Sequence, residues 1–200
     1  MSPEELGERR IGALLHDDGL PRITSSYTDY SDGVTGFIRE QFQPPLVLTR
    51  DGFVLEPLGP EHNERDYAAW TSSVEHIRAT PGYEDSSWPR PMTLEENLGD
   101  LEMHARHFAA RQGFTYTVLD AGTREVIGCV YVYPADDGVH DAQVRSWVRA
   151  SRADLDVPLW RVVSNWLASD AWPFTNVLYA SRGAEPSVRW DDDGIHGQQL

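Results

Sequence analysis

Three β-type runs stand close together in the middle of the chain, and their spacing restricts the fold more than any other feature. They cover residues 114–120, 126–134 and 142–150, and only short, turn-rich segments separate them. Segments of this length can join antiparallel neighbours, but they are too short for the crossover that a parallel pair requires. The runs therefore predict an antiparallel meander.

Helical patterns stand on both sides of the meander. Apolar residues recur at helical spacing in residues 60–79 and 94–112, and again from about 157 to 171. A strand hairpin is expected at 46–58, and a last strand at 176–181. This order of elements predicts an α+β domain with a mixed, mostly antiparallel sheet flanked by helices, rather than a doubly wound sheet.

The helix expected at 94–112 has the clearest local signals. Thr93, followed three residues later by Glu96, is a capping-box pattern that marks the helix start. Its expected buried stripe consists of Leu94, Leu98, Leu101, Ala105 and Phe108.

Histidine and cysteine are the obvious candidates for metal chemistry. His104 and His107 lie one turn apart, with Asp100 a turn before, so a metal site is conceivable. Their place near the polar side of the helix favours a solvated face instead. Cys129 is the single cysteine, which excludes an internal disulfide, and its position within a β-type run predicts a small buried hydrophobe. We therefore expect no metal site.

The charge of the chain restricts its partners. A formal net charge of -15 opposes binding to nucleic acid or to an anionic membrane surface, and favours a cationic partner such as an amine or a basic peptide. All 17 basic residues are arginines, which excludes a P-loop lysine and Schiff-base chemistry.

The sequence divides into three parts. Residues 1–45 read as an extension that docks on the main domain, residues 46–182 as that domain, and residues 183–200 as a polar tail. The start of the chain does not resemble a signal peptide, and no run of about 18 apolar residues occurs. We therefore expect a cytoplasmic protein.

Two stretches carry a family resemblance. Leu55-Glu56-Pro57-Leu58, between a strand and a helix, is similar to the opening of the Gcn5-related N-acetyltransferases. The hairpin containing Val126-Ile127-Gly128-Cys129-Val130 resembles that family's hydrophobic-Gly-hydrophobic strand. Together with the order of elements, these stretches make residues 46–182 resemble the fold of that family.

The resemblance implies an acetyl-CoA site. In the family, the strand before the main helix bends at a bulge and splays from its neighbour. Acetyl-CoA lies in the resulting cleft, and its pyrophosphate binds amides of a loop of the form Arg/Gln-x-x-Gly-x-Gly/Ala. Arg152 matches the first position of that pattern, whereas Leu155 and Val157 replace its small residues. The implied cofactor residues are Trp147, Val148, Arg149, Arg152, Leu155 and Val157.

The same loop departs from what an anion site needs. Side chains at Leu155 and Val157 keep the backbone away from a diphosphate, and Pro158 removes an amide donor. Asp154 and Asp156 add negative charge, and Asp156 is well placed to cap the following helix. Acetyl-CoA binding through this loop is therefore in doubt.

Candidate catalytic groups follow from the resemblance as well. The carboxylates expected near the acceptor amine are Glu56, Glu75, Glu84 and Asp85, and of these Glu56 and Glu84 are the candidate general bases. Tyr179 is the candidate general acid toward the leaving thiolate. The loop 81–91, with Tyr83 and Trp88, could be a substrate lid or could pack over the sheet.

Two functions stay open. One is transfer of an acetyl group from acetyl-CoA to an amine of a small molecule or peptide. The other is a non-catalytic binding or dimerisation module that has lost acetyl-CoA binding. No helix pattern follows Ser181, where the family usually continues with a helix and two strands, so an exposed sheet edge would favour a homodimer.

Overall fold

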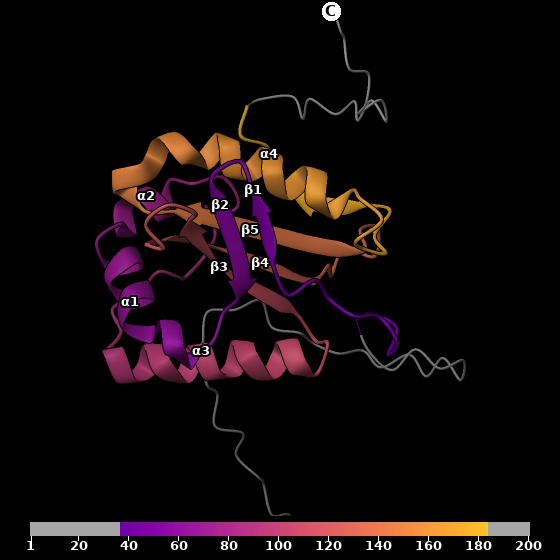
Figure 1. The fold of residues 1–200 in the computed structure, drawn as a ribbon, viewed down its shortest axis with the longest axis horizontal. Helices are drawn as coiled ribbons and strands as arrows, with labels where there is room; N and C mark the ends of the chain where they lie inside the picture. Colours follow the sequence, from indigo (N-terminus) through magenta and orange to yellow (C-terminus); the bar gives the residue numbers. More distant parts are fainter. Residues whose placement is uncertain (1–36, 184–200) are drawn as a thin grey trace, which may run out of the picture.

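The computed structural model describes residues 37–183. A six-stranded sheet forms its centre, with the strands in sequence order from β1 to β6 (Figure 1). All neighbouring strands are antiparallel except β5 and β6, which are parallel. The strands are β1 Leu48–Arg50, β2 Phe53–Pro57, β3 Phe114–Asp120, β4 Val126–Pro134, β5 Ala142–Val148 and β6 Val177–Tyr179.

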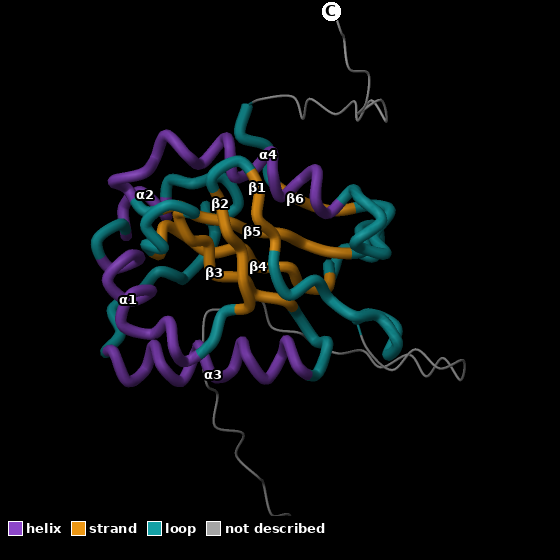
Figure 2. Tube along the Cα trace, in the orientation of Figure 1, coloured by secondary structure: helices purple, strands orange, loops and turns teal. Residues whose placement is uncertain are grey.

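Helices cover both faces of the sheet (Figure 2). They are α1 Asn63–Thr71, α2 Val74–Arg78, α3 Leu94–Ala109 and α4 Asp156–Leu167, with 3₁₀ turns at Pro60–His62 and Ala150–Leu155. The predicted α+β class and the antiparallel meander are both confirmed.

Two apolar clusters form the core, one on each face of the sheet. The α4-side cluster joins that helix to the sheet through Leu159, Val163 and Trp166. The α1-side cluster contains Trp70 from α1, Ile77 from α2 and Leu101 from α3, together with Trp147 from β5. Because successive strand residues face opposite sides, the continuous apolar runs of β3 and β4 supply both clusters.

The first hairpin turns where the sequence predicts. Arg50 pairs with Phe53, and the two residues between them, Asp51 and Gly52, have φ of 50° and 85°. Positive φ at both central positions is the geometry of a tight two-residue hairpin turn, which aspartate and glycine tolerate.

The segment before β1 packs against the α4-side cluster. Phe42 contacts Phe114 and Trp172, with ring centroids 6.3 and 5.6 Å away. Backbone carbonyls of the segment accept hydrogen bonds from Tyr116 Oη and Arg111 Nε, at Pro45 (2.8 Å) and Phe42 (3.0 Å) respectively. This segment therefore covers one end of the sheet; most of the predicted extension, and nearly all of the predicted tail, lie outside the described residues.

The helix predicted at 60–79 is in fact two helices. α1 and α2 are separated at Ser72 and Ser73, whose hydroxyls donate to the carbonyl of Ala69 at 2.9 and 2.8 Å. Hydroxyls that bond backward in this way compete with the helix ladder. Ser73 Oγ also accepts the amide of Ala150 at 2.9 Å, so the break ties α1 to the turn before α4.

The buried side of α3 differs from the predicted stripe. Leu94 is 40% exposed, whereas the polar Asn97 and His104 are buried beside Leu101. Asn97 Oδ1 accepts a hydrogen bond from Trp70 Nε1 at 2.8 Å, which holds α3 against α1. A stripe based on apolar residues alone misses these positions because paired polar groups can be buried.

The predicted capping box is present at the start of α3. Thr93 Oγ1 accepts the amide of Glu96 at 3.1 Å, and the Glu96 carboxylate accepts the amide of Thr93 at 2.6 Å. We expect Thr93→Ala to lower the free energy of unfolding by about 1 kcal/mol, because one helix amide loses its partner. Urea denaturation measures this; Thr93→Ser should retain most of the stability, and equal losses in both variants would contradict the capping role.

Candidate functional site

Strands β5 and β6 pair over only part of the length of β5. They pair in parallel over three residues, from Ala142 opposite Val177 to Val144 opposite Tyr179. Beyond that point β5 continues to Val148 while its partner strand has ended. The resemblance implies a bulge in the strand before the main helix, but this expectation is wrong for β5, which pairs with β4 without a register shift.

Arg182 lies at the opening between the two strands, by which we mean the edge of β5 beyond Val144 that β6 leaves unpaired. Its side chain is only 2% exposed, and its Nε donates to Asp156 Oδ2 at 2.8 Å. Nη1 donates to the carbonyls of Pro81 (3.0 Å) and Ala180 (2.9 Å), and Nη2 to the carbonyl of Ser146 (3.1 Å). The carbonyl of Ser146 belongs to the part of β5 that pairs with β4 but has no partner in β6. A guanidinium therefore satisfies the strand edge that the parting leaves open.

The predicted capping role of Asp156 is wrong. The turn Ala150–Leu155 runs directly into α4, so Leu155 is the N-cap residue and no side chain caps the helix. One carboxylate oxygen of Asp156 pairs with Arg182, and the other is buried without a hydrogen-bond partner. The negative charge of Asp156 is thus paired with the positive charge of Arg182.

The loop before α4 has its cationic groups already paired. Both terminal nitrogens of Arg152 donate to Asp120 Oδ2 at 3.1 Å, and Arg149 forms an ion pair with Glu125. Leu155 packs at the edge of the α4-side cluster. A diphosphate at this loop would have to compete with two carboxylates for the arginines.

The remaining implied cofactor residues lie inside the core. Trp147 is fully buried on the α1 side, where its Nε1 donates to Tyr131 Oη at 3.3 Å. Val148 is fully buried in the α4-side cluster. Val157 is partly buried at the start of α4.

The three predicted catalytic residues lie in different parts of the fold. Glu56 is on β2 and Tyr179 on β6, with three strands between them, which at about 4.8 Å per spacing separates them by roughly 19 Å. Glu84 lies in the exposed loop after α2, where its carboxylate accepts the amide of Gly82 at 2.7 Å. The structure does not bring these three side chains together.

Hydrogen bonds at the two glutamates and burial at the tyrosine shift each pKa away from what the predicted role requires. Burial acts to raise the pKa of Glu56, but hydrogen bonds from Arg124 and His62 outweigh it and hold the pKa below its ordinary value. Backbone hydrogen bonds, including one from Gly82, lower the pKa of Glu84. Burial raises the pKa of Tyr179, whose hydroxyl lies 2.5 Å from Ser146 Oγ. Two weakened bases and an enclosed phenol do not form an acid–base pair.

Loop 81–91 packs over the sheet rather than standing open as a lid. Trp88 lies among Trp70, Tyr83, Tyr131 and Trp147, with ring centroids 5.9 to 6.4 Å away. The hydrogen bond from Arg182 to Pro81 ties the start of this loop to the opening between β5 and β6.

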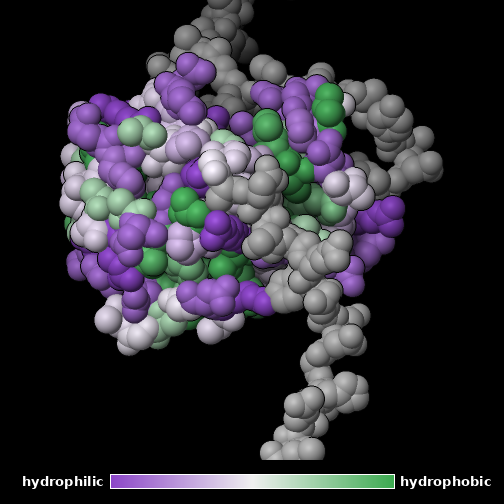
Figure 3. Space-filling view, turned by 90° about the horizontal axis from the view of Figure 1, so that it is seen from above, coloured by the Kyte–Doolittle hydropathy of each residue, from purple (hydrophilic) through white to green (hydrophobic). Residues whose placement is uncertain are grey.

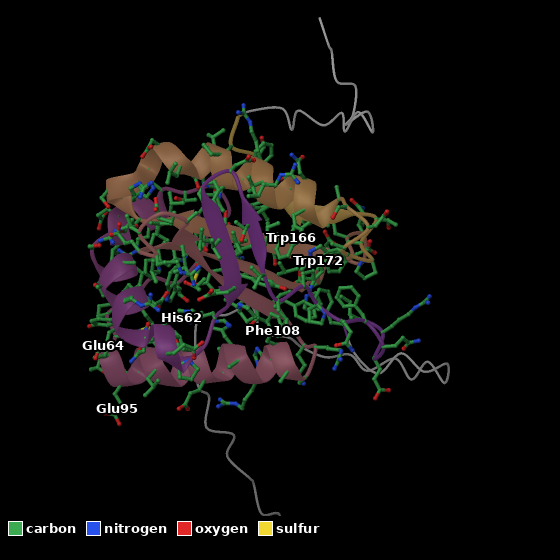
Figure 4. The ribbon with its side chains drawn as sticks, viewed as in Figure 1. His62, Glu64, Glu95, Phe108, Trp166 and Trp172 are labelled. Atoms are coloured by element: carbon green, nitrogen blue, oxygen red, sulfur yellow. The ribbon has the colours of Figure 1, made fainter. Side chains whose placement is uncertain are left out.

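Asp66 on α1 is a buried carboxylate. It follows three polar residues in the sequence, so no local pattern distinguishes it from an exposed side chain. Its oxygens accept from Asn97 Nδ2 (3.2 Å) and from Cys129 Sγ (3.7 Å), and burial raises its pKa to about 6. The buried His62 lies near the same end of α1 (Figure 4). The prediction that Cys129 is a buried small hydrophobe is confirmed.

The predicted solvated face at His104 and His107 is also wrong for His104. His104 is buried, and its Nδ1 lies 2.8 Å from Tyr133 Oη and 3.0 Å from Thr115 Oγ1. His107 Nδ1 lies 3.1 Å from the same tyrosine hydroxyl. Burial lowers the pKa of His104 to about 3, so it is neutral at physiological pH. Within residues 37–183, no cluster of three or more His, Cys, Asp or Glu side chains could hold a metal ion.

Two further properties bear on partners. None of the helices in residues 37–183 is long and apolar enough to cross a membrane. The face of the molecule on the α4 side, seen from above in Figure 3, is mainly hydrophilic, and its apolar side chains form a few small groups.

No protein-family model and no curated protein sequence matches the chain. Solved structures do. A probable acetyltransferase superimposes with a TM-score of 0.52 and 14% identity, over 70% of this chain and 77% of that one. The ribosomal-protein-S5-alanine acetyltransferase from Vibrio fischeri (TM-score 0.47, 12% identity) and a microcin C7 self-immunity acetyltransferase in complex with acetyl-CoA and AMP (0.45, 11%) each match over 62% of this chain and 67% of their own.

Of these three matches, the one to the probable acetyltransferase has a TM-score above 0.5. At 14% identity it bears on the fold alone. This chain has the fold of the Gcn5-related N-acetyltransferases.

Proposed function

We propose that this chain is a divergent member of the Gcn5-related N-acetyltransferases that has lost acetyl-CoA binding and works as a non-catalytic binding module. The observation that carries this proposal is the buried Arg182 side chain, which occupies the opening between β5 and β6. That opening is where the family resemblance would place the cofactor.

Displacing Arg182 would be costly. An incoming ligand would have to replace its hydrogen bonds to three carbonyls, and Asp156 would lose its partner while remaining mostly enclosed. Breaking a buried ion pair in this way costs about 3–5 kcal/mol. Acetyl-CoA would have to recover that free energy at a loop whose two arginines are already paired.

The second candidate is acetyl transfer from acetyl-CoA to an amine of a small molecule or peptide. The parting of the two strands favours it, because this is the feature of the fold that serves the cofactor in the family. It requires that Arg182 leave the opening and that a base other than Glu56 or Glu84 serve the amine. A homodimer through the sheet edge at β6, the last strand, and a cytoplasmic location are further expectations compatible with either candidate.

Acetyl-CoA binding separates the two candidates. A ligand at about ten times its Kd stabilises a protein by about 1.4 kcal/mol, which thermal unfolding readily detects. We expect no rise in Tm with 1 mM acetyl-CoA and no binding heat in calorimetry. A clear rise, accompanied by release of free CoA thiol in the presence of an amine, would instead establish the transferase.

A further inference from the structure

Arg145 is a partly buried arginine on β5 without a counter-ion. Its Nε atom is buried and has no hydrogen-bond partner, and the ion pairs among residues 37–183 do not include it. Other arginines of the described residues also lack an ion pair, but Arg161 and Arg39, for example, are exposed to water, whereas Arg145 is partly buried. A guanidinium that is partly shielded from water and has no ion-pair partner is a group that an anion would stabilise.

Tyr83 holds this guanidinium and has an unused hydroxyl of its own. Arg145 Cζ lies over the Tyr83 ring, 6.0 Å from its centroid, which is a cation–π arrangement. The Tyr83 side chain is 3% exposed, and its Oη has no hydrogen-bond partner. Two neighbouring polar side chains thus have hydrogen-bonding capacity that the described residues leave unsatisfied, which is uncommon in folded proteins.

The surroundings favour a single negative charge. Arg182 acts on the Tyr83 hydroxyl electrostatically, as Arg145 does, but it is already paired with Asp156. Glu84 is exposed in the same loop, and its carboxylate interacts electrostatically with both Arg182 and Arg145. A monoanion matches the single charge of Arg145, which has no ion-pair partner, whereas a doubly charged phosphate would also meet the fields of Asp156 and Glu84.

We propose that Arg145 and Tyr83 form a binding site for the carboxylate group of a small organic ligand. The planar guanidinium can bind both oxygens of a carboxylate through parallel hydrogen bonds. The Tyr83 hydroxyl can donate a further bond. The ring of Trp88, 5.9 Å from that of Tyr83, supplies an apolar surface for the remainder of the ligand. The proposal rests on the binding role proposed above and names the chemistry of its ligand.

Titration with sodium benzoate, sodium acetate, sodium phosphate and sodium chloride at constant ionic strength tests the site. We expect the ¹⁵N-detected Nε–Hε signal of Arg145 to shift and saturate with benzoate and acetate, benzoate binding more tightly. Arg145→Gln should weaken the binding about tenfold or more, because a charge-assisted bidentate pair is lost. Arg161→Gln, which removes an exposed arginine of α4, should leave it unchanged.

Tyr83→Phe provides a second arm that does not depend on the charge of Arg145. Removing an unpartnered buried hydroxyl should raise the Tm of the free protein, and it should also reduce the affinity for benzoate. An equal response of wild type and Arg145→Gln would overturn the proposal, as would an equal response to chloride, tighter binding of phosphate than of acetate, or no response at all. Each result is independent of whether acetyl-CoA binds.

Discussion

Replacing Arg182 with alanine is expected to lower the free energy of unfolding by about 3–5 kcal/mol. The change leaves the Asp156 carboxylate without its partner, although that side chain is only 16% exposed. It also leaves the carbonyl of Ser146 without a donor at the open edge of β5. Both losses act in the folded state, where the groups are shielded from water, and hardly at all in the unfolded state.

Chemical denaturation of matched variants measures this effect. Arg106→Ala is the control, because Arg106 is 68% exposed and its ion pair with Glu102 spans 3.9 Å, so its loss should be below about 1 kcal/mol. Arg182→Met combined with Asp156→Leu should recover much of the stability, since no charge is then left unpaired. If Arg182→Ala costs no more than Arg106→Ala, Arg182 does not close the opening.

The fold was predictable because its signals are local. The turn at Asp51 and Gly52, the capping box at Thr93 and the short segments between β3, β4 and β5 each restrict the chain within a few residues. The break between α1 and α2 was missed because it depends on a serine hydroxyl that bonds both to its own helix and to Ala150, 77 residues away.

The site was less predictable because its decisive contacts are distant in the sequence. Arg182 meets Asp156 across 26 residues and Pro81 across 101. Asp156 had the local pattern of a helix cap, but a neighbouring arginine competes for its carboxylate. His104 likewise lay within a polar pattern, and its burial depends on Thr115 and Tyr133 from the sheet. Local pattern identifies an element, whereas the partner of a buried charge is set by tertiary packing.

Asp66 makes the stability of this protein depend on pH. Burial raises its folded-state pKa to about 6, above the ordinary value of 3.8, so the folded state binds a proton more tightly than the unfolded state. The stabilisation is complete below about pH 4 and is lost as the pH rises through 6. A difference of about two pKa units corresponds to about 3 kcal/mol. We expect Asp66→Asn to be more stable than wild type by up to that amount at pH 8 and nearly equal to it at pH 4.

Urea denaturation of both proteins from pH 4 to pH 8 checks this, and the difference between them isolates Asp66 from His104. The neutral His104 acts in the opposite direction, because its lowered pKa makes the folded state less stable as the pH falls below about 6.5. The matched substitution Asp154→Asn, at an exposed position, serves as the control for replacing a carboxylate by an amide. Asn97, Cys129, His62 and Asp100 are the groups that act on Asp66, and an asparagine can still accept from Asn97 Nδ2. A difference between Asp66→Asn and wild type that does not change with pH would show that the Asp66 carboxylate is not protonated more readily in the folded state.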